Sequence, residues 1–83
     1  MPFSLDWLRS RAAVTPDKLA VLFEGQAVTY RMLDQLADRL AAGLIADGVA
    51  TGDRVAVRAS TSVAYVALIH AVARLGGVLV PLN

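Results

Sequence analysis

The most regular pattern in the chain is a helical repeat of apolar side chains that begins just after Thr29. Apolar residues recur at the spacing of one helix face, and charged or amide residues fill the opposite face, as in an amphipathic surface helix. We expect Thr29 to cap the first turn, Gly48 to end the helix, and the apolar face to be core. The apolar face comprises Leu33, Leu36, Ala37, Leu40, Leu44 and Ile45. The polar face comprises Arg31, Asp34, Gln35, Asp38, Arg39 and Asp47.

Two shorter elements are expected before this helix. Ser4 can cap a short first helix, Asp6 at its second position suits the positive end of the helix dipole, and Pro16 prevents the helix from continuing. Beyond it, two segments rich in apolar and β-branched residues lie on either side of Gly25-Gln26. This pattern predicts a β-hairpin whose two-residue turn uses the positive φ of the glycine.

The last third of the chain has the pattern of a strand, a helix and a second strand. Residues 54–59 (RVAVRA) form a short segment with two arginines on one face and two valines on the other, residues 63–75 are apolar nearly all round, and an apolar strand follows Gly76-Gly77. A crossover of this length joins parallel strands, which predicts a βαβ unit. The predicted fold class is therefore α/β, a β-hairpin plus a parallel βαβ unit with flanking helices. Because the chain stops after the second strand, we expect it to be the opening of a larger domain.

Composition indicates that part of the apolar surface is covered by something else. Hydrophobic residues make up 57% and charged residues 18% of the chain, whereas charged residues form about 25% of an ordinary domain. A membrane-spanning helix needs ~20 apolar residues. The apolar run from Val63 is interrupted by His70, so it is too short and we expect no membrane-spanning helix. The net charge is +1 with acids and bases interspersed, and cysteine is absent, so we expect no nucleic-acid partner, disulfide or thiolate metal site. A cytoplasmic protein is expected.

Few residues are candidates for chemistry. Residues 60–62, Ser-Thr-Ser, lie at a predicted helix N-terminus and could hold an anion, but the glycines and lysine of a phosphate loop are missing, and Lys18 is the only lysine. Plain helix capping is therefore favoured. His70 lacks a ligand or carboxylate at helical spacing, which favours a structural role. Asp34 and Asp38 are one turn apart, and the nearby arginines favour a solvated charged face over a catalytic pair.

Two further pairs of residues are noteworthy. Arg54 and Arg58 share one face of their strand, which is unusual in a sheet covered on both sides. An edge position, side chains that extend to water, or an ion pair with further chain would each explain them. Trp7 and Tyr65 are interpreted as packing aromatics because little polar chemistry accompanies them.

Four sequence segments in order resemble the start of an adenylate-forming enzyme. They are residues 6–21 (DWLRSRAAVTPDKLAV), 28–33 (VTYRML), 48–57 (GVATGDRVAV) and 75–83 (LGGVLVPLN). Their order is similar to that of acyl-CoA synthetases, adenylation domains of nonribosomal peptide synthetases and luciferases. The first segment is most similar to o-succinylbenzoate–CoA ligases. One position departs from the family pattern, because Met32 stands where a glutamate usually completes a capping box.

The resemblance implies a parent enzyme that uses ATP and Mg²⁺ to form an acyl-adenylate and then a thioester, usually with coenzyme A. The family's phosphate loop, nucleotide contacts, Mg²⁺-binding glutamate and catalytic lysine lie further along such chains. No catalytic, cofactor-binding or metal-binding residue is therefore assigned here, and residues 1–83 are expected to be an N-terminal fragment of the large domain, inactive alone.

Two other functions remain open. The chain could open an amino-acid-adenylating domain of a nonribosomal peptide synthetase, or it could be a stand-alone α/β module that binds a protein partner through its apolar faces. The expected partners are the remainder of a synthetase chain or a second copy.

Overall fold

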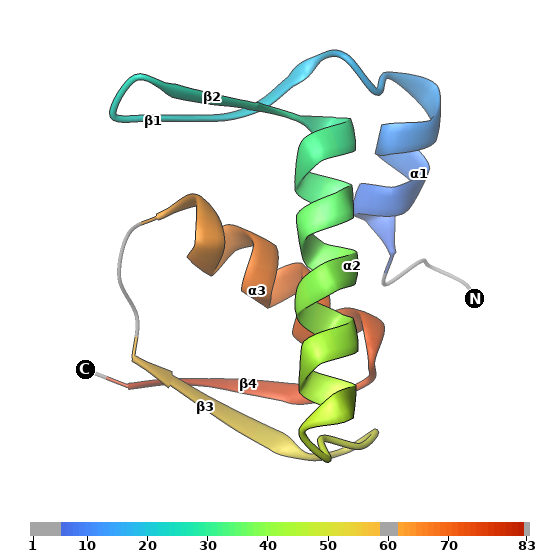
Figure 1. The fold of residues 1–83 in the computed structure, drawn as a ribbon, viewed down its shortest axis with the longest axis vertical. Helices are drawn as coiled ribbons and strands as arrows, with labels where there is room; N and C mark the ends of the chain where they lie inside the picture. Colours follow the sequence, from blue (N-terminus) through green and yellow to red (C-terminus); the bar gives the residue numbers. More distant parts are fainter. Residues whose placement is uncertain (1–5, 59–61, 83) are drawn as a thin grey trace.

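The computed structural model describes residues 6–58 and 62–82, which form three helices and two small sheets. Figure 1 shows helix α2 running the length of the molecule, with the hairpin at one end, the second sheet at the other, and α1 and α3 beside it. This arrangement confirms the α/β prediction. The elements are α1 (Trp7–Val14), β1 (Leu19–Phe23), β2 (Gln26–Thr29), α2 (Tyr30–Ala46), β3 (Arg54–Arg58), α3 (Val63–Arg74) and β4 (Val78–Leu82).

Helix α2 begins and ends where the sequence predicts. The side-chain oxygen of Thr29 accepts a hydrogen bond from the backbone N–H of Met32 at 3.2 Å. At the other end Gly48 has a φ of 98°, a left-handed conformation that glycine adopts readily. The N–H of Gly48 donates to Ile45, and that of Val49 donates to Leu44, both at 3.0 Å. These bonds satisfy carbonyls that the last turn would otherwise leave free.

The hairpin is confirmed, but its turn lies one residue earlier than predicted. Phe23 pairs with Gln26, so the two turn residues are Glu24 and Gly25. Their φ angles are 48° and 79°, as a turn with two left-handed residues requires. Gly25 supplies a positive φ as expected, and Glu24 adopts one despite its side chain. The local sequence suggested Gly25-Gln26 because only Gly25 carries a recognisable turn signal.

Helix α1 starts later than the predicted cap implies. Ser4 lies outside the described residues, and Asp6 stands at the N-cap position without a side-chain hydrogen bond to the first turn. The Asp6 carboxylate bonds Arg74 of α3 instead. The helix ends at Val14, before Pro16, as predicted.

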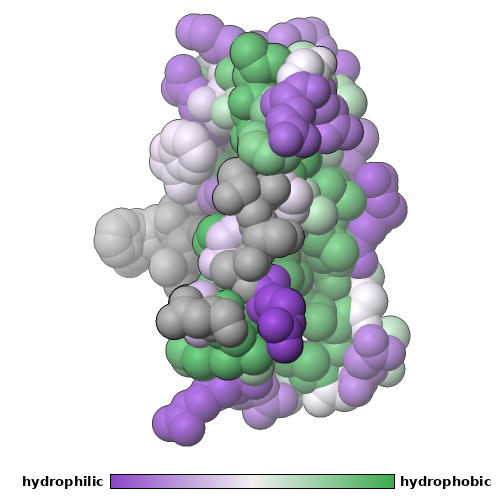
Figure 2. Space-filling view, turned by 90° about the vertical axis from the view of Figure 1, so that its left-hand side faces the viewer, coloured by the Kyte–Doolittle hydropathy of each residue, from purple (hydrophilic) through white to green (hydrophobic). Residues whose placement is uncertain are grey.

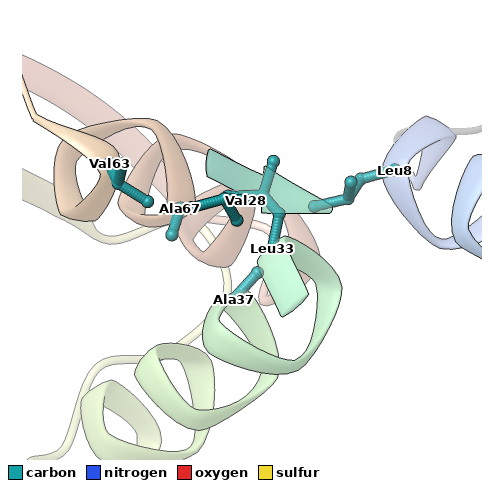
Figure 3. Packing of buried hydrophobic residues seen from close by; sticks show 6 residues of the cluster. All are labelled: Leu8, Val28, Leu33, Ala37, Val63 and Ala67. Carbon is teal, nitrogen blue, oxygen red and sulfur yellow. The ribbon is translucent and has the colours of Figure 1, made fainter. Parts of the chain in front are cut away.

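The hydrophobic core lies where α1, β2, α2 and α3 meet. Figure 3 shows its side chains converging from these four elements. Its buried members are Leu8, Val28, Leu33, Ala37, Val63 and Ala67. Ala37 and Ala67 are fully buried, and such small residues let two helices approach closely. The core thus consists of three closely packed helices, α1, α2 and α3, covered at one end by the β-hairpin.

The core face of α2 agrees in part with the predicted one: Leu33 and Ala37 are buried as predicted, and Ala41, which was not on the predicted face, is buried as well. Its buried residues are Leu33, Ala37 and Ala41, whereas Leu36, Leu40 and Leu44 are only half-buried. Ile45, which we placed on the apolar face, is 58% exposed. The buried stripe follows the small residues because they allow α3 to pack against α2.

The βαβ unit is confirmed. Strands β3 and β4 are parallel, with Arg54 opposite Val78 and Arg58 opposite Leu82. Helix α3 buries Val63, Ala67, Ala71 and Val72 but leaves Ile69 41% exposed.

Much apolar surface stays uncovered on the described residues. Leu22 on β1, and Val78 and Leu82 on β4, are 66%, 51% and 44% exposed. Figure 2 shows apolar surface along one side of the molecule between polar edges. No helix among residues 6–58 and 62–82 is both long and apolar enough to cross a membrane.

Candidate functional site

The densest group of polar side chains surrounds Arg74, where α3 meets α1 and α2. We call Asp6, Arg9, Asp34, Asp38 and Arg74 the Arg74 cluster. Arg74 Nε donates to Asp6 Oδ1 at 2.9 Å, and Nη1 donates to the backbone oxygen of Asp34 at 2.9 Å and to Asp38 Oδ1 at 3.1 Å. Nη2 pairs with Asp34 Oδ1. One guanidinium therefore joins the N-cap of α1 to two successive turns of α2.

Electrostatics favour a permanently charged Arg74 at the centre of this cluster. The Arg74 side chain is only 7% exposed. Its burial alone would lower the pKa, but hydrogen bonds and charges from Asp6 and Asp34 outweigh burial and raise the pKa of Arg74 above its ordinary value. Arg9 adds a second cation, with its Nε 3.4 Å from Asp6 Oδ2. A permanently charged guanidinium cannot act as an acid or base near neutral pH.

The cluster corrects one interpretation of the sequence. We expected Asp34 on a solvated face beside Arg31 and Arg39, but its side chain is 21% exposed and lies against Arg74. Asp38, at 54% exposure, is on the surface as predicted. Arg31 pairs with Asp17 instead, at 2.8 Å. The one signal in the sequence was the single charged residue, Arg74, near the end of an otherwise apolar helix.

Three aromatic rings lie next to the cluster. Trp7 meets Tyr30 edge to face, with ring centroids 6.0 Å apart and an interplanar angle of 76°. Trp7 also stacks on His70, with centroids 6.4 Å apart and an angle of 23°. Burial, and then the charge of Arg74, lower the pKa of His70, while Asp6 acts in the opposite direction. Trp7 and His70 thus pack against each other, although Trp7 remains 55% exposed.

No metal-ligand cluster accompanies these rings in the part of the chain that the structure describes. Within that part, no three His, Cys, Asp or Glu side chains are grouped so that they could hold a metal ion.

A shallow hollow of about 210 Å³ lies at the N-terminus of α3. Its lining comprises Leu40, Val57, Arg58, Ser62, Ala64, Tyr65 and Leu68. The Ser62 hydroxyl accepts a hydrogen bond from the Tyr65 N–H at 3.1 Å, which confirms capping at this position. Residues 60 and 61, the rest of the segment that we considered as an anion loop and interpreted as a plain helix cap, lie outside the described residues. Tyr65 borders the hollow, and most of the lining is apolar.

Strand β3 presents its two arginines on an open face. Arg54 and Arg58 are exposed, whereas Val55 and Val57 between them are half-buried. Within residues 6–58 and 62–82, neither arginine takes part in a salt bridge. In the described part of the chain β3 and β4 are both edge strands, a position that accommodates two exposed arginines.

Comparison with known proteins shows the family. The model of the AMP-binding enzyme family matches residues 8–83. The chain is 43% identical to the feruloyl-CoA synthase of an Amycolatopsis species over 77 residues, 93% of this chain and 16% of that protein. It is 42% identical to a plipastatin synthase of Bacillus subtilis over 73 residues, 88% of this chain and 3% of that protein.

Solved structures agree with the sequence matches. A double mutant of the o-succinylbenzoate CoA synthetase of Bacillus subtilis superimposes with a TM-score of 0.89 at 36% identity, over 93% of this chain and 16% of that structure. This chain thus spans a small part of the proteins that it matches. The resemblance inferred from the four sequence segments is confirmed. The chain belongs to the AMP-binding enzyme family and has the fold of the N-terminal portion of adenylate-forming enzymes.

Proposed function

We propose that residues 1–83 are an N-terminal scaffold segment of the large domain of an ATP-dependent acyl-CoA ligase. The observation that carries the proposal is the family match over residues 8–83, with CoA-dependent synthases among the similar proteins. Such an enzyme joins a carboxylate to AMP, releases pyrophosphate, and transfers the acyl group to the sulfur of coenzyme A. ATP, Mg²⁺ and coenzyme A are therefore the cofactors proposed for the whole enzyme, and its location is proposed to be cytoplasmic.

The described residues do not suit an ATP triphosphate, so we assign no adenylation step to them. Adenylation needs cations and a metal ion around the phosphate oxygens as charge develops on pyrophosphate. Arg74 is already surrounded by aspartates. Lys18 precedes β1 in the hairpin, and Arg58 ends β3 in the other sheet. These cations come from separate elements, which supports the proposal that the 83 residues alone are inactive.

The open faces suggest how a scaffold segment would contribute. Parallel sheets are normally covered on both faces, yet Val78 and Leu82 of β4 are 51% and 44% exposed. We propose that the remainder of the synthetase packs on this sheet. The two strands and the layer formed by α2 and α3 would provide the ordered surface for that packing. Self-association through the same apolar faces is the corresponding proposal for the chain on its own.

Two other functions have some support. The 42% identity to the plipastatin synthase favours an adenylation domain whose substrate is an amino acid and whose acceptor is carrier-bound pantetheine. A stand-alone interaction module is the other candidate, and a monodisperse monomer that melts cooperatively would favour it. Aggregation or obligate assembly would favour the scaffold segment.

A chimera tests the scaffold proposal directly. This chain would replace the matching 77-residue segment of the feruloyl-CoA synthase, and thioester formation would be measured with a panel of carboxylic acids. A scaffold predicts activity within about tenfold of the parent and an unchanged order of preferred acids. The same chimera with Arg74→Ala is the matched control and should be less stable with the same preferences. A folded chimera with a different acid preference would show that this segment selects the substrate.

A further inference from the structure

Two residues of α3 hold the start of α1. His70 and Arg74 are one helical turn apart and both reach α1. His70 stacks on Trp7, with ring centroids 6.4 Å apart, and Arg74 donates to the neighbouring Asp6 at 2.9 Å. Leu8, the next residue of α1, is fully buried in the core. The first turn of α1 is therefore held against α3 by one aromatic stack and one ion pair, and Leu8 anchors it in the core. Toward α2 it also makes the Trp7–Tyr30 ring contact and the ion pairs of Arg9 with Asp34 and Asp38.

The charged groups of the Arg74 cluster come from all three helices, and Arg74 and Asp6 are the ones that act on His70. Asp6 and Arg9 belong to the start of α1, Asp34 and Asp38 to α2, and Arg74 to α3, while the Tyr30 ring meets Trp7 edge to face. The carboxylates already face guanidinium groups: Asp6 bonds Arg74 Nε and lies 3.4 Å from Arg9 Nε. Asp34 and Asp38 also bond Arg74. A new positive charge on His70 would compete with two arginines for these carboxylates.

We propose that His70 is a pH-sensitive latch: its neutral imidazole holds Trp7, and with it α1, against α2 and α3, and its protonation loosens α1. The imidazole ring is half-buried, so an imidazolium there loses hydration. It also lies one turn from the Arg74 guanidinium.

The expected direction of the pH effect follows from linkage. Burial first, and Arg74 second, lower the pKa of His70 below its ordinary value of 6.5 in the folded chain, against a smaller opposing effect of Asp6. The undocked state therefore binds the proton more readily than the docked state. The contribution of His70 to docking is complete above the ordinary histidine pKa and is lost as the pH falls through the lower, folded value. This inference concerns the fold of the chain itself and is independent of the proposed function.

The composition of the chain makes the latch directly measurable, because it has a single tryptophan, Trp7, and a single histidine, His70. The emission wavelength of Trp7 would be followed from about pH 8 to about pH 5, above the range where aspartates titrate. Amide hydrogen exchange, corrected for its intrinsic pH dependence, would be compared between α1 and α2 at the two ends of the titration. Exchange separates release of the helix from simple quenching of the indole by a nearby imidazolium.

Two variants decide the outcome. In the wild-type chain we expect a red shift of Trp7 emission at low pH and a loss of protection in α1 of more than about twofold relative to α2. His70→Phe keeps an aromatic ring against Trp7 without a titrating group and should stay docked at every pH. His70→Gln should show no pH-dependent step in this range, whether or not α1 is docked. An equal step in the wild type and both variants, a flat wild-type response, or a chain without ordered helices at pH 8 by circular dichroism would overturn the proposal.

Discussion

Replacing Arg74 with alanine should destabilise the chain strongly, because this one side chain connects three helices. Its guanidinium is 7% exposed and bonds three aspartates and a backbone carbonyl. Removing one partner from a buried ion pair costs about 3–5 kcal/mol. Here two of the carboxylates can rehydrate, since Asp6 and Asp38 are 38% and 54% exposed. We therefore expect a loss of about 2–4 kcal/mol, with Asp34 contributing most.

That loss is large for a chain of this size. A domain of 83 residues has a free energy of unfolding of roughly 4–12 kcal/mol. Urea unfolding followed by circular dichroism should show a midpoint lowered by at least about 1 M, given a slope of roughly 1–2 kcal/mol per molar. Combining Arg74→Ala with Asp34→Asn in a double-mutant cycle should give a coupling energy above about 1 kcal/mol.

Arg9→Ala is the matched control for this prediction. Arg9 contacts the same carboxylates as Arg74 but is 53% exposed, and an exposed ion pair contributes about 0–1 kcal/mol. The two variants remove the same charge from the same cluster and differ in burial. If Arg74→Ala costs no more than Arg9→Ala, the account of Arg74 as the connection among the helices is wrong.

Two further pairs of variants test the packing and the backbone. Leu8→Ala should lower the free energy of unfolding by about 2–5 kcal/mol, because Leu8 is fully buried. Leu22→Ala, at a 66% exposed site, should change it by no more than about 0.5 kcal/mol. Similar losses for the two variants in urea unfolding would contradict the position of the core. Gly43→Ala should stabilise α2 by about 0.5–1 kcal/mol, since an added Cβ meets nothing within 4 Å. Gly76→Ala should destabilise the chain, because φ is 78° there and the Cβ would lie 2.9 Å from Thr51 Cγ2. Melting temperatures that shift in the same direction for both glycine variants would refute this reasoning.

The features predicted correctly from the sequence are those set by neighbouring residues. Thr29 and Gly48 mark the ends of α2 because their hydrogen bonds involve residues only three positions away. Ser62 caps α3 for the same reason. The parallel pairing of β3 and β4 follows from the length of the crossover.

The features that escaped prediction depend on residues distant in the chain. Asp34 leaves the solvated face because Arg74, 40 positions later, reaches it. Ala41 is buried while Leu40 and Leu44 are only half-buried, because the packing of α3 against α2 decides which side of the apolar face is covered. Neither partner can be identified from the periodicity of α2 alone, since a helical repeat shows which residues share a face but not which neighbour covers it.

In the candidate site, too, features set by neighbouring residues were predictable and features set by distant residues were not. Capping at the N-terminus of α3 is local and was predicted. The hollow beside it needs Leu40 from α2 and Arg58 from β3 in addition to α3, so it emerges only when three elements come together.

ATP–pyrophosphate exchange by the 83-residue chain tests the central claim most directly, with aryl, fatty and amino acids as substrates and a titration of labelled ATP alongside. A scaffold segment without an adenylation site predicts no exchange above the blank and no ATP binding in the micromolar range. Exchange that persists after contaminating synthetase is removed, or micromolar ATP binding that is lost on Ser62→Ala, would contradict the account and place nucleotide chemistry at the N-terminus of α3.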